Sequence, residues 1–135
     1  MIYVKFLQTN PIDQQNENSF SDIIKAELDF HNKGYKNYHL MLLSGDDRTM
    51  LQDSFFNNDG RLSNSEILAD IVIKRLIKEI KYLPKDNENF GILIVSPRYM
   101  YTPMNLYKNT LDRFLNRLKS NLKEIVVNNS IFVEE

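Results

Sequence analysis

Two short segments carry the side chains best suited to holding an anion. Thr9-Asn10-Pro11 follows an apolar run at the N-terminus, and Asn18-Ser19-Phe20 stands at the start of a predicted helix. Hydroxyl and amide side chains, together with the free N–H groups of a helix start, can bind a phosphate without a lysine. Serine and asparagine are also ordinary helix-capping residues. The sequence therefore predicts either a phosphate loop or a plain helix cap at these positions.

A third segment, Ser96-Pro97-Arg98-Tyr99-Met100-Tyr101, follows the apolar run Gly91–Val95. Its two tyrosines either pack beside a flat ligand or close the end of the sheet against neighbouring helices. Arg98 is either a surface charge or the partner of a ligand phosphate. Both interpretations place this segment at the exit of a predicted strand, where a ligand would meet it.

Other kinds of chemistry find little support. Asp46 and Asp47 are hard-oxygen metal ligands by type, but consecutive side chains diverge and the predicted turn holds no third acid. We therefore expect a solvated turn there and no metal site. His31 and His39 have no serine or aspartate at motif spacing, and neither a Gly-x-Ser-x-Gly nor a Walker motif is present. The absence of cysteine excludes disulfides and thiolate chemistry, so we expect no catalytic side chain.

The composition indicates one globular domain over residues 1–135, with 42% hydrophobic residues. Lys and Arg number 17 and Asp and Glu 18, so charge gives no reason to expect a nucleic-acid or membrane partner. The basic cluster Lys74/Arg75/Lys78/Lys81 has no interleaved aromatics, and we expect it to be the solvated side of a helix. Met1–Leu7 is too short for a signal peptide and no run could span a bilayer, so a cytoplasmic location is expected.

Hydrophobic periodicity predicts alternating strands and helices. Strands are predicted at residues 2–7, 38–43, 91–95 and 124–127, with a final short strand at 131–133. One helix should bury Phe20, Ile23, Ile24 and Leu28 and stop at Gly34. A second should start at a capping box of Ser63 and Glu66 and run to Pro84, and a third should start at Thr102-Pro103 and run to Leu122. Thr49–Arg61 is predicted to be a loop.

Apolar strands without polar interruption are typical of strands covered on both faces. The sequence therefore predicts an α/β fold: an open, mostly parallel sheet of four or five strands with helices on both faces. Ligands of such sheets bind outside the carboxyl ends of the strands. Three predicted loops lie at that end, namely Gln8–Phe20, Ser44–Arg48 and Ser96–Thr102.

The run from Gly91 to Phe114 resembles the flavodoxin-like NAD(P)H-dependent FMN reductase family. That family has an apolar strand, then Ser-Pro-x-Tyr, a spacer, and Leu-x-Lys-Asn/Ala-x-Leu/Ile-Asp-Arg/Trp. The residues that match this pattern are Ser96, Pro97, Tyr99, Leu106, Lys108, Asn109, Leu111 and Asp112. The resemblance implies a flavodoxin-like fold.

The resemblance also implies an FMN-binding oxidoreductase that passes electrons from NAD(P)H to a quinone, a flavin or a similar small acceptor, and it implies a homodimer. The expected phosphate-binding residues are Thr9, Asn10, Pro11, Asn18, Ser19 and Phe20. The expected neighbours of the flavin ring are Ser96, Pro97, Arg98, Tyr99, Met100 and Tyr101. The cofactor would carry the chemistry, and the protein would position it.

The chain departs from the family in its middle and at its end. Residues 47–62 match nothing specific, and Ile125–Asn129 lacks the glycine-containing loop that the family has near the flavin. A five-stranded order 2-1-3-4-5 needs residues 131–133 as its last strand; otherwise four strands leave an exposed edge for a partner to cover. A second hypothesis is therefore a shortened domain without flavin, serving as an interaction or small-ligand-binding module. A chance resemblance is a third, and it would be favoured by a structure without a parallel sheet.

Overall fold

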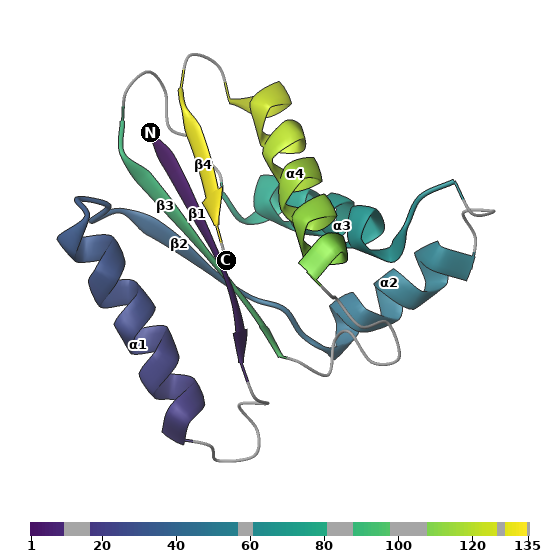
Figure 1. The fold of residues 1–135 in the computed structure, drawn as a ribbon, viewed down its shortest axis with the longest axis horizontal. Helices are drawn as coiled ribbons and strands as arrows, with labels where there is room; N and C mark the ends of the chain where they lie inside the picture. The colour runs from purple at the N-terminus through teal and green to yellow at the C-terminus, as the bar shows by residue number, and fades with distance from the viewer. Residues whose placement is uncertain (10–16, 57–60, 81–87, 98–107, 127–128, 135) are drawn as a thin grey trace.

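The computed structural model describes residues 1–9, 17–56, 61–80, 88–97, 108–126 and 129–134. In this part the chain alternates strands and helices (Figure 1). The elements in chain order are β1 (Ile2–Thr9), α1 (Glu17–Asn32), β2 (Tyr38–Leu42), α2 (Gly45–Phe56), α3 (Asn64–Glu79), β3 (Phe90–Pro97), α4 (Lys108–Ile125) and β4 (Ile131–Glu134).

The strands form one parallel sheet in the order β2-β3-β1-β4. β1 pairs with β3 along its whole length, from Ile2 opposite Phe90 to Thr9 opposite Pro97. On its other side β1 pairs with β4 only from Ile2 to Lys5. The predicted open parallel α/β fold is confirmed, with four strands. Its order differs from 2-1-3-4-5, because here the third strand lies between the first and the second.

The strand order fixes which face each helix covers. The chain passes from β1 to β2 in one direction across the sheet, and it returns in the other direction to β3 and then to β4. Because parallel crossovers are right-handed, the first connection must lie on one face and the later two on the opposite face. Figure 1 shows this arrangement, with α1 alone on one side and α2, α3 and α4 on the other.

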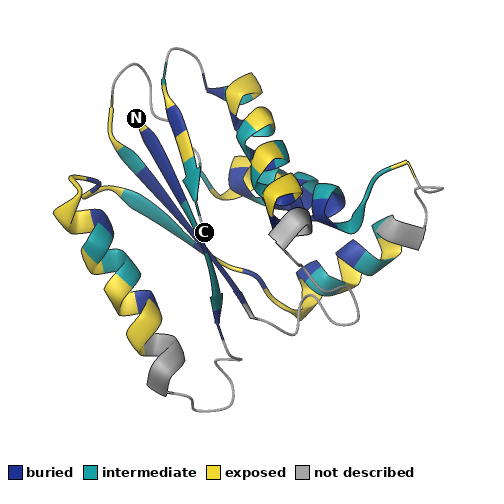
Figure 2. Cartoon of the chain, viewed as in Figure 1, coloured by how far each residue is buried: buried dark blue, intermediate teal, exposed yellow. Residues whose placement is uncertain are grey.

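Each face of the sheet has its own core. Alternate residues of β1 point to opposite faces, so Val4 and Phe6 join the core under α3 and α4 while Tyr3 joins the core under α1. The α1 core is small and rich in aromatic residues: Tyr3, Ile23, Phe30, Tyr35, Leu93 and Val95. Figure 2 shows the buried residues concentrated on β1, β3 and the inner sides of the helices.

Two predicted elements are wrong. Of the strand predicted at 124–127, residues 124–126 do not form a strand, because Leu118 and Leu122 are followed at helical spacing by buried Val126, whose N–H donates to the Leu122 carbonyl at 2.9 Å. Thr49–Arg61 is not a loop throughout, because α2 extends from Gly45 to Phe56 and buries Leu51. The final strand was predicted correctly and forms the edge beside β1.

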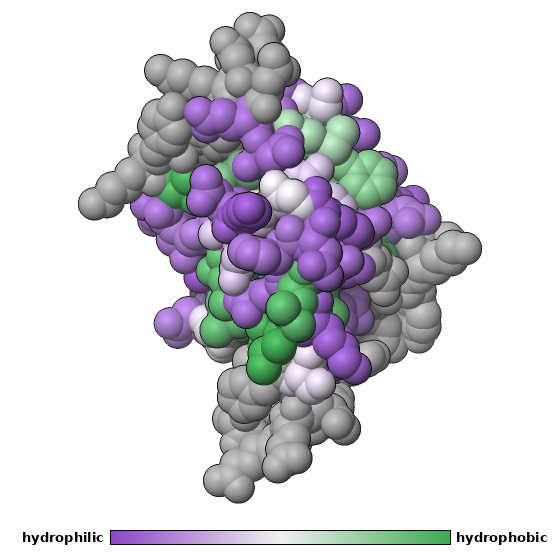
Figure 3. Space-filling model, turned by 90° about the vertical axis from the view of Figure 1, so that its left-hand side faces the viewer, coloured by the Kyte–Doolittle hydropathy of each residue, from purple (hydrophilic) through white to green (hydrophobic). Residues whose placement is uncertain are grey.

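Two helix boundary signals are confirmed, whereas α3 ends at Glu79, short of the predicted end at Pro84, because Ile80 is already extended. Ser63 and Glu66 form the predicted capping box at the start of α3, and Gly34 adopts a φ of 91° just beyond α1. The buried face of α1 differs from the prediction, since Ile24 and Leu28 are 55% and 58% exposed. Phe30 and Tyr35 fill that core instead. Figure 3, which shows the α1 side, has apolar surface among the polar residues.

We expect Gly91→Ala to destabilise the fold by about 1–3 kcal/mol because the core around it is closely packed. A Cβ at this position would lie 2.8 Å from Phe30 Cδ2 and 2.9 Å from Tyr38 Cβ. Gly45→Ala is the matched control, because nothing lies within 4 Å of its added Cβ. Urea unfolding measures both variants, and equal stabilities would contradict this account of the α1 core.

Candidate functional site

The carboxyl ends of β1 and β3 form the point where the sheet changes winding direction. They are neighbours, with Gln8 opposite Ser96 and Thr9 opposite Pro97. The chain leaves β1 toward α1 on one face and leaves β3 toward α4 on the other (Figure 1). Connections that leave adjacent strands toward opposite faces define a switch point, and this is where open α/β sheets bind ligands. The structure thus brings the ends of two predicted binding segments together.

Two hydroxyl side chains flank this switch point. Leu7 packs against the α1 core, so Thr9, two residues further along β1, lies on the same face. Ile92 and Ile94 belong to the opposite core, so Ser96 lies on the face of α3 and α4. Thr9 is 2% exposed and Ser96 0%. The Thr9 hydroxyl has no hydrogen-bond partner in the described part of the chain.

The start of α1 belongs to the same end of the sheet. A helix that connects two parallel strands runs antiparallel to them, and Figure 1 shows the first turn of α1 on the side of the strand tips. Asn18, Ser19 and Phe20 lie in that first turn, because α1 begins at Glu17. The N–H groups of a helix start have no intrahelical partners, so they are available to an anion.

The structure corrects the strand boundaries at the predicted site. Thr9 is the last residue of β1, and Ser96 and Pro97 are the last residues of β3, so all three belong to strands and not to exit loops. The pairing of the two central strands extends the ladder by two residues on each strand beyond the sequence prediction. The predicted site residues Asn10, Pro11, Arg98, Tyr99, Met100 and Tyr101 lie outside the described residues, as does the predicted start of the third helix.

The segment after β2 is not the predicted solvated turn. It is the first turn of α2, and Asp47 is buried at 4% exposure. The Asp47 carboxylate accepts hydrogen bonds from the Ser44 backbone N–H at 2.8 Å and from Arg75 Nη1 at 2.8 Å. A buried carboxylate needs such a partner. Arg75 therefore faces a buried acid, whereas Lys74 and Lys78 of the same predicted cluster are exposed as expected and Lys81 lies outside the described residues.

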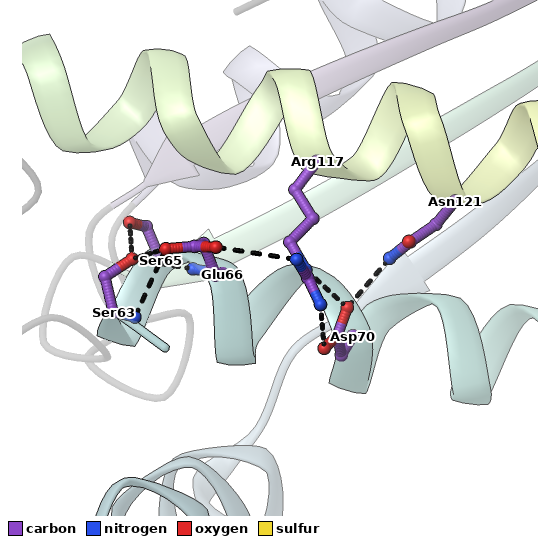
Figure 4. Close-up of polar contacts among 6 residues, drawn as sticks. All are labelled: Ser63, Ser65, Glu66, Asp70, Arg117 and Asn121. Atoms are coloured by element: carbon purple, nitrogen blue, oxygen red, sulfur yellow. Dashed lines mark hydrogen bonds and ion pairs between the residues drawn. The ribbon is translucent and has the colours of Figure 1, made fainter. Parts of the chain in front are cut away.

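A polar network between α3 and α4 was not foreseen from the sequence (Figure 4). Arg117 of α4 binds Asp70 of α3 through two parallel hydrogen bonds, Nε to Oδ1 at 2.9 Å and Nη2 to Oδ2 at 3.0 Å. Asn121 donates to Asp70 Oδ1 at 2.9 Å, and Arg117 Nη1 lies 3.5 Å from Glu66 Oε2. No sequence motif marks these pairs, because their members lie about one turn apart on each helix and meet only when the helices pack.

The surroundings of this network favour the charged forms of Asp70, Glu66 and Arg117. Burial by itself raises the pKa of Asp70, but hydrogen bonds from Arg117 and Asn121 and the positive charges nearby bring that pKa below its ordinary value. Hydrogen bonds from the Ser63 side chain and backbone lower the pKa of Glu66. The hydrogen bond to Asp70 raises the pKa of Arg117. A carboxylate that stays ionised in this way is a poor proton donor or acceptor near neutral pH, so these residues are not suited to acid–base catalysis. Their contacts instead hold α3 against α4.

A shallow hollow lies beside this network, between α3 and α4. Its lining mixes both charge signs: Glu66, Arg113, Asn116, Arg117, Ser120, Asn121 and Glu124. Arg117 is already bound to Asp70 and Glu66, so its charge is largely neutralised for a ligand in the hollow. The switch point offers the better candidate site, because it combines a buried hydroxyl with the start of α1.

Comparison with known proteins gives no relative: no family model, no curated protein and no solved structure matches this chain. Within the described residues, no group of three or more histidines and acidic residues could hold a metal ion. None of the described helices combines the length and the apolar character needed to cross a lipid bilayer.

We expect Asp70→Asn to lower the free energy of unfolding at pH 7 by about 1 kcal/mol, since it breaks a two-bond ion pair. Because the pKa of Asp70 is lower in the folded than in the unfolded state, its contribution is fully present above an unfolded pKa of about 3.9. That contribution disappears as the pH falls through the folded pKa. Denaturant titrations from pH 7 to pH 3 should therefore show the variant converging on the wild type at low pH.

Asp112→Asn is the control, because Asp112 is an exposed carboxylate on α4. Its stability should stay within about 0.5 kcal/mol of the wild type at every pH. A constant difference between Asp70→Asn and the wild type across this pH range would contradict a charged Asp70 as the centre of the network.

Proposed function

We propose that this protein binds FMN, with the phosphate at the switch point between β1 and β3. It acts in the cytoplasm as an oxidoreductase that passes electrons from NAD(P)H to a small acceptor such as a quinone or a flavin. One observation carries the phosphate site: the Thr9 hydroxyl is buried at the end of β1 and lacks a partner in the described part of the chain. A buried hydroxyl without a hydrogen bond costs free energy. A ligand oxygen would remove that cost.

The residues at the switch point fit the phosphate end of such a ligand. The start of α1 adds backbone N–H groups and the positive end of the helix dipole on the face where Thr9 lies. No lysine or arginine is required for this mode of binding. FMN, when bound, supplies the acceptance and donation of electrons, and the protein orients it and excludes water.

The choice of FMN among phosphorylated ligands rests on the resemblance of the run from Ser96 to Asp112. Ser96 and Pro97, with which that run begins, end the strand next to Thr9. A phosphate bound near Thr9 would leave the rest of the ligand free to extend past the end of β3, toward the segment expected beside the ring. No side chain is needed as an acid or base in this scheme.

One observation favours the second candidate, a module that binds a phosphorylated small ligand other than FMN. The strand order β2-β3-β1-β4 differs from the order 2-1-3-4-5 expected for the flavin-binding family. With this strand order the sheet still has a switch point between β1 and β3, where a phosphate would bind. The strand order gives less support to the expected position of the flavin ring. The two candidates share the Thr9 site and differ in the ligand.

The first experiment is a titration of the purified full chain with FMN, followed by quenching of flavin fluorescence and by reduction of bound flavin with NADPH or NADH. Saturable binding with a pyridine-nucleotide-dependent loss of absorption near 450 nm is expected. No binding of FMN, together with binding of another phosphorylated small molecule at the same site, would support the second candidate and refute the oxidoreductase.

Thr9→Val separates the role of the hydroxyl from its place in the fold. Because the wild-type hydroxyl is buried and has no partner among the described residues, valine should leave the stability of the free protein unchanged or raise it by up to about 1 kcal/mol. The same change should weaken FMN binding about 10- to 100-fold, the value of a hydrogen bond to a charged group. Thr49→Val, on the exposed side of α2, should alter neither quantity. Unchanged FMN affinity in Thr9→Val would contradict the proposed phosphate site.

A further inference from the structure

The two edges of the sheet differ in how well they are protected. At the β2 edge, the carbonyl of Leu42 accepts a hydrogen bond from Arg75 Nη1 at 3.0 Å, so a charged side chain covers an edge group. At the β4 edge, the sequence Ile131-Phe132-Val133 contains no lysine, proline or bulge. Exposed apolar edge strands without such protection are templates for pairing with another chain. The β4 edge is therefore the open one.

The backbone of β4 determines how it could pair. Ile2 N–H donates to the Ser130 carbonyl at 2.7 Å, which fixes the phase of the ladder between β1 and β4. In a parallel ladder, the N–H and C=O groups of one residue both point to the same neighbouring strand, and those of the next residue point to the opposite side. The groups of Phe132 then point toward β1, and those of Ile131 and Val133 point away from the sheet. The backbone N–H and C=O groups that point outward therefore belong to the residues on either side of Phe132.

The side chain of Phe132 is the open end of a stack of rings. On the α1 face, Tyr35 stacks on Tyr3 with 5.2 Å between ring centroids, and Tyr3 stacks on Phe132 with 5.9 Å. Phe132 is 47% exposed, although it belongs to this layer. A ring with one covered face and one free face can extend the stack to a further aromatic residue.

We propose that two copies of this chain pair antiparallel through β4, with the two-fold axis at Phe132. This register joins Ile131 of each copy to Val133 of the other and so uses all four outward backbone groups of each copy. Phe132 then faces Phe132 of the second copy as a non-hydrogen-bonded pair, the arrangement in which side chains approach most closely. The result is a continuous eight-stranded sheet with one uninterrupted stack of rings.

The charges near the edge are compatible with this pairing. In this register, Glu134 lies opposite Ser130 of the second copy, so like charges do not meet. Glu134 is also bound within its own chain: it accepts a hydrogen bond from the Tyr3 hydroxyl, and its Oε1 lies 3.7 Å from Lys33 Nζ and 3.8 Å from Lys5 Nζ. A second copy therefore meets a neutral, apolar edge.

The size of the contact sets the expected affinity. Four backbone hydrogen bonds and one ring pair bury less than the roughly 1,200 Å² of a standard stable interface. We therefore expect association in the range of about 10 μM to 1 mM, visible as a measured mass that rises from 16.0 kDa toward twice that value with concentration. Sedimentation velocity of the full chain measures this directly.

The absence of cysteine allows a site-specific test. In Phe132→Cys, the two thiols would lie across the two-fold axis at a Cα separation of about 4.5 Å, which a disulfide can span. We expect mild oxidation to give a covalent dimer on a non-reducing gel at least fivefold faster than in Leu28→Cys, whose side chain is more exposed on α1. Equal or slower cross-linking at residue 132 would overturn the proposal.

A second variant tests the backbone pairing. Val133→Pro removes only an outward N–H and leaves the ladder with β1 intact, since proline is tolerated at such edge positions. Its dimer dissociation constant should rise at least tenfold, whereas Ile77→Ser on the exposed side of α3 should not change it. Circular dichroism confirms that Val133→Pro is folded. A mass that stays at 16.0 kDa at millimolar wild-type protein, or a dimer unaffected by Val133→Pro, would overturn the inference.

Discussion

The pairing of β1 with β3 is the interaction on which the rest of the structure depends. These two strands form the centre of the sheet, and they are joined over eight residue pairs. Because every crossover is right-handed, placing β3 between β1 and β2 sends α1 to one face and the later helices to the other. The same placement makes the chain leave the two central strands in opposite directions. The switch point at Thr9 and Ser96 is thus a consequence of strand order.

The polar contacts hold the helices around this centre. Asp70, Arg117 and Asn121 join α3 to α4, and Asp47 with Arg75 joins the start of α2 to α3 and to the end of β2. These ion pairs are partly buried, so they define which helix faces meet more than they add stability. They lie on the face opposite α1. The α1 face relies on aromatic packing and leaves Phe132 open at the edge.

Local signals in the sequence were sufficient for the fold class but not for the whole architecture. The capping box at Ser63 and the stop at Gly34 act over a few residues and are found in the structure, as are four of the five predicted strands. Strand order depends on contacts between distant segments, so the position of β3 was not predictable from periodicity.

Asp47 was expected to be solvated because its partner, Arg75, lies 28 residues away. The ion pair between Asp70 and Arg117 was not predicted for the same reason, because 47 residues separate them. At the candidate site, the sequence placed Thr9 and Ser96 in loops just after two strands, whereas the register shows that both residues end these strands and that the ends are neighbours.

The most direct test of this account is to locate the ligand by amide NMR of the ¹⁵N-labelled full chain during addition of FMN, with inorganic phosphate in a parallel series. The account predicts that both additions shift the amide signals of Thr9 and of the first turn of α1, and that FMN also shifts Ser96. Amides around Arg117 and Asn121 should not respond. Shifts confined to the hollow between α3 and α4, with Thr9 unmoved, would contradict the assignment of the binding site to the switch point between β1 and β3.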